Sequence, residues 1–113
     1  MEKHPNREFA ALSVLAMQLR ERFAERGPAW TAEQVMQGFV GDVGDLMKLV
    51  MARQGLRTIP DADVKLGHEL ADCLWSVLVL ARLYEVDLES EFVRMIDEIS
   101  RRLETSSTSP SRA

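Results

Sequence analysis

The 113-residue chain has little of several features that point to particular classes of protein. Its single cysteine, Cys73, excludes an intrachain disulfide. The longest apolar-rich run, residues 73–83, is interrupted by Ser76 and Arg82 and falls short of the about 20 apolar residues that span a bilayer. The N-terminal sequence MEKHPNREF lacks the apolar core of a signal peptide. We therefore expect a soluble, cytoplasmic protein with no membrane partner.

The chain also has no excess of basic residues, and its formal net charge is −4 at pH 7. Nucleic-acid binders usually carry a basic surface, so we expect no nucleic-acid partner. Apolar residues make up 46% and charged residues 28%, which is typical of a globular protein rather than a disordered one. A chain of this length forms one domain with a limited core, so we expect its copies to associate.

Apolar residues recur three and four positions apart in four segments, which predicts four helices and no strands. The expected helices span roughly residues 6–26, 31–53, 61–84 and 87–104. Thr31 and Gln34 form a predicted capping box at the start of the second helix, and Gly55 is its expected stop. Short loops between long helices favour antiparallel neighbours. The sequence therefore predicts an all-α, oligomeric four-helix bundle over residues 1–104, followed by a disordered tail at 105–113.

Two pairs of acids interrupt the apolar sequence of the second and third helices: Asp42 with Asp45, and Glu69 with Asp72. Residues three apart are neighbours on a helix surface, so each pair presents two carboxylates side by side. Ionised carboxylates at the edge of a core are costly unless a proton, a basic side chain or a cation compensates them. Mg²⁺ prefers oxygen ligands and commonly binds one or two carboxylates together with substrate phosphates. Two acid pairs on facing helices are suited to hold one or two such ions.

A purely structural interpretation fits the same pattern about equally well. Each pair would then lie on a solvated helix face, with Lys48 pairing Asp45 and Lys65 pairing Glu69. Trp30 likewise has two interpretations: its ring either stacks on a nucleobase or packs as a hydrophobic staple at the start of the second helix.

Two stretches of the sequence resemble a known family. VGDVGDL, residues 40–46, and KLGHELADCLWSVLVLA, residues 65–81, are similar to the motifs EExxE and ExxD of the MazG-like all-α nucleoside triphosphate pyrophosphohydrolases. The first stretch is closest to the dCTP pyrophosphatase branch, where it reads roughly VGEVGEL. The likeness continues into VDLESEFVRMIDEISRR and covers about residues 25–102.

The resemblance implies a Mg²⁺-dependent enzyme, with Mn²⁺ as an alternative ion, that cleaves a (deoxy)nucleoside triphosphate to the monophosphate and pyrophosphate. It also implies a dimer or tetramer in which neighbouring subunits complete the pocket. By position, it assigns metal binding and catalysis to Asp42, Asp45, Glu69 and Asp72. The positions of Arg94, Glu98 and Ser76 correspond to substrate contacts of the family, and Trp30 is a further substrate candidate because its ring could stack on the base.

Several positions depart from the family pattern. Asp42 and Asp45 replace glutamates, and their shorter side chains hold the carboxylates closer to the helix axis. Arg94 stands for a lysine, Glu98 for an asparagine, and Ser76 for a tyrosine. The shorter aspartates and the added charge of Glu98 motivate an alternative function, in which the chain is a catalytically weakened helical module for nucleotide sensing or oligomerisation.

Overall fold

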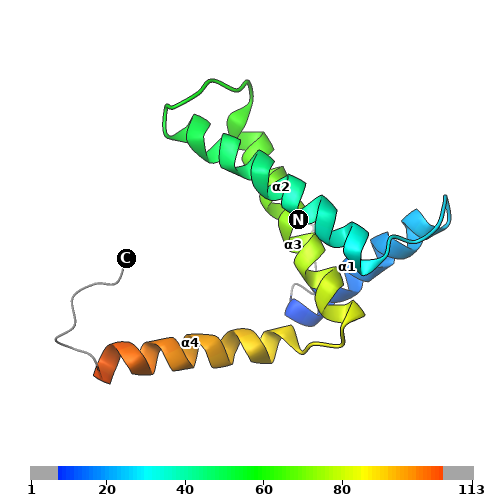
Figure 1. Ribbon diagram of the computed structural model, residues 1–113, viewed down its shortest axis with the longest axis vertical. Coiled ribbons are helices and arrows are strands. Elements are labelled where there is room, and N and C mark those ends of the chain that lie inside the picture. The colour runs from blue at the N-terminus through cyan, green and yellow to red at the C-terminus, as the bar shows by residue number, and fades with distance from the viewer. Residues whose placement is uncertain (1–7, 106–113) are drawn as a thin grey trace, which may run out of the picture.

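A computed structural model describes residues 8–105, and within that range the chain forms four α-helices and no strand (Figure 1). The helices are α1 (Phe9–Ala24), α2 (Ala32–Arg53), α3 (Ala62–Leu83) and α4 (Leu88–Thr105). The all-α prediction with four helices is thereby confirmed. Thr105, the first residue of the predicted tail, ends α4, and residues 106–113 lie outside the described range. In the part of the chain described here, no helix is long and apolar enough to cross a membrane.

The start of α2 is fixed by the predicted capping box. The Gln34 backbone N–H donates to Thr31 Oγ1 at 3.2 Å, and the Thr31 N–H donates to Gln34 Oε1 at 2.9 Å, so the prediction is confirmed. Arg20 Nη2 of α1 donates to the Trp30 carbonyl at 2.6 Å, which ties α1 to this end of α2. The Trp30 ring lies over Gly38, where an added Cβ would come within 3.3 Å of ring atom Cζ3. A glycine at this position therefore lets the ring approach the helix.

The end of α2 is a hydrogen-bonded turn around the predicted stop, Gly55. Gly55 has a φ of 79°, in the left-handed region that favours glycine. The Leu56 N–H donates to the Met51 carbonyl at 2.8 Å, and the Gly55 N–H donates to the Ala52 carbonyl at 3.1 Å. These bonds satisfy the last carbonyls of the helix, as in a Schellman motif. The helix stop predicted at Gly55 is confirmed.

The end of α3 uses the same turn, but with a glutamate in the left-handed position. Glu85 has a φ of 56°, and the Val86 N–H donates to the Ala81 carbonyl at 2.8 Å. A non-glycine residue in this conformation costs roughly 1–2 kcal/mol. Asp87 then caps α4: the Ser90 hydroxyl donates to its Oδ2 at 2.8 Å and the Ser90 N–H donates to its Oδ1 at 3.2 Å. These hydrogen bonds lower the pKa of Asp87.

The core is formed by the first three helices. α2 and α3 lie side by side and run antiparallel, and α1 packs against α3 (Figure 1). The buried cluster joins Val35 of α2, Ala16 of α1, and Leu78 and Val79 of α3. Trp75 Nε1 donates to the Ala16 carbonyl at 3.0 Å, which fixes α1 against α3. This packing holds α2 and α3 in a set register, and both predicted acid pairs lie on these two helices.

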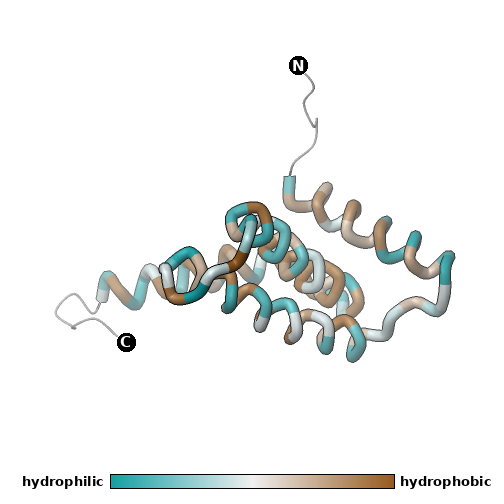
Figure 2. Tube along the Cα trace, turned by 90° about the horizontal axis from the view of Figure 1, so that it is seen from above, coloured by the Kyte–Doolittle hydropathy of each residue, from teal (hydrophilic) through white to brown (hydrophobic). Residues whose placement is uncertain are grey.

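α4 leads away from the other three helices (Figure 1). Leu88 at its first position packs against the core, whereas every residue from Glu89 to Thr105 is exposed. Brown apolar positions recur along the helix in Figure 2 and form an exposed stripe of Phe92, Met95, Ile96, Ile99 and Leu103. The radius of gyration is 17.8 Å, compared with about 13 Å for a compact domain of this length. Within one chain α4 therefore does not close a bundle, and the oligomeric state stays a prediction.

Candidate metal centre and adjoining pocket

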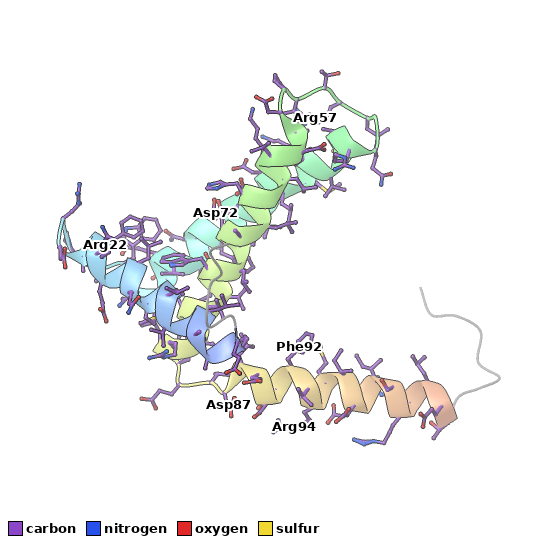
Figure 3. All side chains as sticks on the ribbon, turned by 180° about the vertical axis from the view of Figure 1, so that it is seen from behind. Arg22, Arg57, Asp72, Asp87, Phe92 and Arg94 are labelled. Atoms are coloured by element: carbon purple, nitrogen blue, oxygen red, sulfur yellow. The ribbon has the colours of Figure 1, made fainter. Side chains whose placement is uncertain are left out.

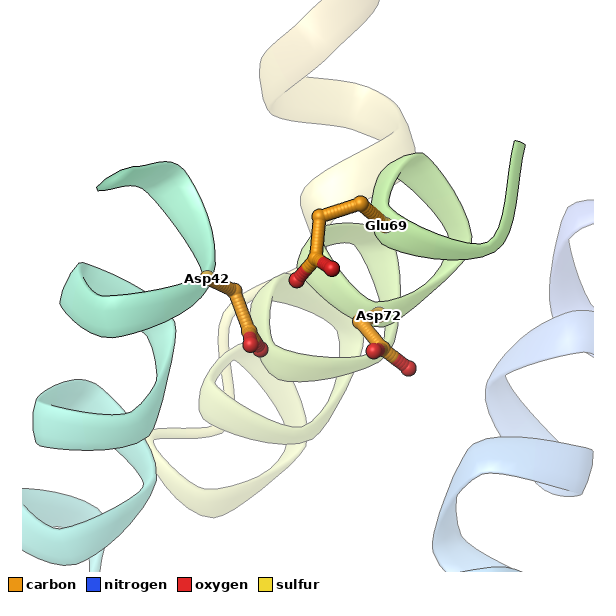
Figure 4. A group of neighbouring side chains, drawn as sticks. All are labelled: Asp42, Glu69 and Asp72. Carbon is orange, nitrogen blue, oxygen red and sulfur yellow. The ribbon is translucent and has the colours of Figure 1, made fainter. Parts of the chain in front are cut away.

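Three of the four predicted carboxylates meet between α2 and α3. Asp42 comes from α2, and Glu69 and Asp72 come from one face of α3 (Figure 4). One oxygen from each side chain lies within 4.8 Å of the others, and all three residues are half-buried. The register of the antiparallel pair thus brings together acids that are 27 to 30 positions apart in the chain.

Glu69 is the member of this carboxylate cluster whose pKa is raised. Burial raises the pKa of its carboxyl, and a hydrogen bond with Asp42 raises it further. The negative charges of Asp42, Asp72 and Asp45 act in the same direction. A hydrogen bond between two carboxyl groups requires a proton on one of them, which favours the protonated form of Glu69. Glu69 Oε2 is also buried without a hydrogen-bond partner among the described residues.

This arrangement fits a divalent cation. Buried acceptors without donors are costly, and close carboxylates repel one another. A hard cation bound by Asp42, Glu69 and Asp72 would satisfy the orphan oxygen and offset the repulsion at the same time. The three residues therefore have the chemistry of a metal centre, and their metal role stays a prediction.

Asp45 is not part of this group of three. It lies one turn further along α2, is exposed, and lines a neighbouring pocket instead. Its charge still contributes to the raised pKa of Glu69. Residues three apart on a helix differ by about 60° around its axis, so only one of the two can face α3 squarely. Asp45 therefore lines the pocket, and its metal role stays a prediction.

The pocket beside the carboxylate cluster has a volume of about 430 Å³ and lies between α2 and α3. Glu69 belongs to both, so the pocket adjoins the cluster at this residue. Two lysines line it, Lys48 from α2 and Lys65 from α3, together with His68. Its apolar wall is formed by Leu49, Ile59 and Val64.

The lysines of this pocket do not make the ion pairs of the structural interpretation. Among residues 8–105, the ion pairs join other side chains, and neither the Lys48–Asp45 nor the Lys65–Glu69 pair forms. That expectation was wrong because helical spacing brings residues within reach without fixing their rotamers. His68 Nε2 lies 3.4 Å from Asp72 Oδ2, so this histidine is a neighbour of the carboxylate cluster. The pocket was not predicted from the sequence. The sequence feature that could have indicated it is the presence of a lysine close to each acid pair.

Cys73 follows Asp72 but has a different role. Burial raises the pKa of its thiol, and the charges of Asp42, Glu69 and Asp72 raise it further. The thiolate is the form that attacks substrates and binds metals. A thiol held in its protonated form here serves neither purpose.

Two predicted substrate residues lie on the three packed helices or directly before them. The side chain of Trp30 is 52% exposed beyond its contact with Gly38, so one part of the ring remains open to a ligand. Ser76 is only 3% exposed and lies among core residues of α3. No accessible hydroxyl remains there in a single chain, and the substrate role of Ser76 has no support from this structure. Both assignments stay predictions.

The other two predicted substrate residues lie on α4, apart from the carboxylate cluster. Figure 3 shows Arg94 and Phe92 on opposite sides of α4, and Asp72 on the separate α2–α3 pair. Arg94 Nη1 pairs with Glu91 Oε1 at 2.8 Å, and Glu98 is exposed. One chain therefore does not bring Arg94 or Glu98 to the carboxylates, and their roles stay predictions.

Comparison with known proteins supports one family. The chain has no match among curated proteins and none among solved structures. A family model described as the MazG nucleotide pyrophosphohydrolase domain matches residues 30–106, which is more than half of the chain. The matched region contains α2, α3 and α4, and with them all four predicted carboxylates. The chain therefore belongs to the MazG nucleotide pyrophosphohydrolase domain family.

Proposed function

We propose that this chain is a metal-dependent pyrophosphohydrolase that cleaves a (deoxy)nucleoside triphosphate to the monophosphate and pyrophosphate. The observation that carries the proposal is the meeting of Asp42, Glu69 and Asp72 within 4.8 Å, beside a buried Glu69 oxygen without a partner among the described residues. Mg²⁺ is the proposed ion, with Mn²⁺ as a second choice, because both accept an all-oxygen ligand set. Family membership supports the reaction class.

The proposed reaction adds water across the bond between the α- and β-phosphates. Phosphoryl transfer depends mainly on positioning and charge neutralisation. A divalent ion in this centre would supply Lewis acidity and lower the pKa of water. Asp42, Glu69 and Asp72 would hold that ion, and Asp45 lines the adjoining pocket.

The proposal includes self-association as a dimer or tetramer. The apolar stripe of α4 is exposed along its whole length in a single chain, and so are apolar side chains of α2 such as Val40, Val43 and Met47. A face of this size is usually covered by a partner, and a second copy is the partner that is always present. The nearest branch of the family is proposed to be the dCTP pyrophosphatases, on the likeness of VGDVGDL alone.

A second candidate function is a weakened, nucleotide-sensing module. The observation that favours it is Asp45, which is exposed and outside the group of three. With Asp45 outside the group and an aspartate in place of a glutamate at Asp42, the centre would bind metal less tightly than the full set of glutamates would.

The decisive experiment measures pyrophosphate release from a panel of nucleoside and deoxynucleoside triphosphates, with Mg²⁺ or Mn²⁺. The expected result is turnover of at least one nucleotide that Glu69→Gln abolishes and that Asp97→Asn, an exposed change on α4, leaves intact. Binding of a nucleotide without turnover would favour the sensing module. If Glu69→Gln releases pyrophosphate as fast as the unmodified chain, the proposed metal centre is wrong.

A further inference from the structure

We infer that the pocket lined by Lys48 and Lys65 is an anion subsite that takes the terminal phosphates of the substrate, the part that leaves as pyrophosphate. The inference rests on the proposed function for its substrate class. It assigns the pocket, and two lysines that the family motifs do not include, to one end of that substrate.

The pocket and the carboxylate cluster adjoin each other at Glu69. Glu69 forms part of both, and Asp45 extends the acidic edge into the pocket. A ligand bound at the cluster therefore lies next to a pocket of about 430 Å³. Lys48 lies six residues beyond Asp42, which is about 9 Å along the axis of α2.

The pocket wall carries two positive charges. Lys48 and Lys65 come from opposite helices and face one space, and neither makes an ion pair with another residue in 8–105. Two such cations beside a strongly acidic cluster are a suitable receptor for a multiply charged anion that also carries a metal ion. A lysine ammonium binds phosphate as a point charge without demanding one fixed geometry.

The two ends of the α2–α3 pair differ in chemistry on either side of the cluster. The Trp30 ring lies over Gly38, four residues before Asp42, whereas the lysine pocket lies on the opposite side of Asp42. The cluster is thus flanked by an aromatic surface at one end and by cations at the other. A nucleotide fits this polarity in one orientation, with its base toward Trp30 and its terminal phosphates toward Lys48 and Lys65.

Within one chain, Arg94 of α4 lies away from the carboxylate cluster and adds no positive charge to it. Arg94 is paired with Glu91 at 2.8 Å and lies on the side of α4 opposite Phe92 (Figure 3). If the Phe92 side packs against another surface, Arg94 turns away from that surface. Lys48 and Lys65 provide cations beside the carboxylates within the same chain.

The opposing interpretation places the nucleoside in this pocket, because Leu49, Ile59 and Val64 give it apolar walls. The two orientations differ in which product the lysines contact. We therefore titrate the Mg²⁺-loaded protein separately with inorganic pyrophosphate and with a nucleoside monophosphate, using calorimetry. The variants are Lys48→Met and Lys65→Met. The matched control is Arg57→Met, which removes one charge from the α2–α3 connection outside the pocket (Figure 3).

Each lysine variant is expected to weaken pyrophosphate binding about tenfold, the usual loss for one charge-assisted contact, and to leave monophosphate binding unchanged. Lys48→Arg should restore most of the affinity, and Arg57→Met should bind like the unmodified chain. Because both lysines are exposed, folding should be unaffected; Lys48→Gln and Lys65→Gln provide second substitutions if a methionine variant misfolds.

Unchanged pyrophosphate binding in both lysine variants would overturn the inference, and so would a loss of monophosphate binding that equals or exceeds the loss of pyrophosphate binding. Absence of pyrophosphate binding by the unmodified chain would overturn it as well. Turnover is measured separately. A protein that hydrolyses no triphosphate but binds pyrophosphate through the lysines would refute the proposed function and leave the anion subsite standing.

Discussion

The α2–α3 pair and α4 are built from the same kind of sequence, but they pack differently in one chain. Both show apolar residues at helical spacing and acids on the remaining positions. α2 and α3 bury side chains such as Val35 and Val79 against each other and against α1, whereas α4 exposes its whole stripe. Helical periodicity thus predicts that a face needs a partner, but does not predict which partner it has.

The same contrast divides the candidate site. The carboxylate cluster and the lysine pocket are assembled by α2 and α3 within one chain. Arg94 and Glu98 sit on the helix that has no such support. Residues held by packing are pre-organised, whereas residues on α4 depend on whatever that helix later contacts.

The largest expected effect is the loss of stability when an apolar side chain of the α2–α3 pair is truncated, compared with the same truncation on α4. Leu78→Ala on α3, where Leu78 is 4% exposed, should lower the free energy of unfolding by about 3 kcal/mol. Ile99→Ala on α4, where Ile99 is 42% exposed, should change it by less than about 0.5 kcal/mol in dilute protein. Urea unfolding at low protein concentration measures both. Equal losses would show that α4 packs as tightly within the chain as α3 does.

The next effect is stabilisation by metal, which should be confined to the α2–α3 pair. Mg²⁺ at a hundred times its dissociation constant should stabilise the fold by about 2.7 kcal/mol. Hydrogen exchange should slow in α2 and α3 and stay unchanged in α4. Asp42→Asn should remove the stabilisation, whereas Asp97→Asn on α4 should keep it. Protection that is uniform over all four helices would contradict a metal centre placed at the cluster.

A third test concerns the partner of the α4 stripe. Ile96→Asp introduces a charge into the stripe and should weaken self-association at least about tenfold. Light scattering coupled to size-exclusion chromatography over a dilution series measures the shift. The control is Arg101→Ala on the polar side of the same helix. Association that survives Ile96→Asp unchanged would mean that another surface joins the copies.

A fourth test compares the two helix ends that share a turn. Glu85→Gly should stabilise the chain by up to about 1 kcal/mol, because glycine adopts the positive φ of this position without strain. Gly55→Ala, at the equivalent position after α2, should destabilise it by about 1 kcal/mol for the converse reason. Thermal denaturation of both variants measures the difference. The two substitutions should change the stability in opposite directions. A change in the same direction would show that the two helix ends do not have the same turn.

The smallest expected effect is the pH dependence of the metal-free protein. The pKa of Glu69 is raised above its ordinary value of 4.5, so the folded state binds the proton more tightly than the unfolded chain does. Its ionised form therefore destabilises the fold at neutral pH, and this loss is relieved as the pH falls through the raised pKa toward 4.5. With a chelator present, lowering the pH from 7 to 4.5 should raise the melting temperature relative to that of Glu69→Gln. If the melting temperatures of the two proteins change with pH in the same way, the pKa of Glu69 is not raised in the folded state.

Local chemistry made much of the fold predictable. Thr31 and Gln34 define the start of α2, and Gly55 defines its end, through hydrogen bonds within a few residues. The pairing of Asp42 with Glu69 and Asp72 depends instead on how far each helix is rotated, which no local pattern encodes. That rotation also placed Asp45 in the pocket. The direction of α4 follows from the turn at Glu85 and not from packing of its exposed stripe within the chain, so the sequence predicted the stripe and not its position.

The two tryptophans lie in different surroundings, and this has a practical consequence for spectroscopy. Trp75 is half-buried, with its indole N–H bonded to Ala16 and its ring edge-on to Phe23 at 6.3 Å. Trp30 stands open to water at the far side of the cluster from the lysines. Emission from Trp75 should therefore follow unfolding, while acrylamide quenching of Trp30 should follow the arrival of a base. A Trp75→Phe variant would leave Trp30 as the sole indole, and its fluorescence in the folded protein would then report ligand binding without a contribution from the core.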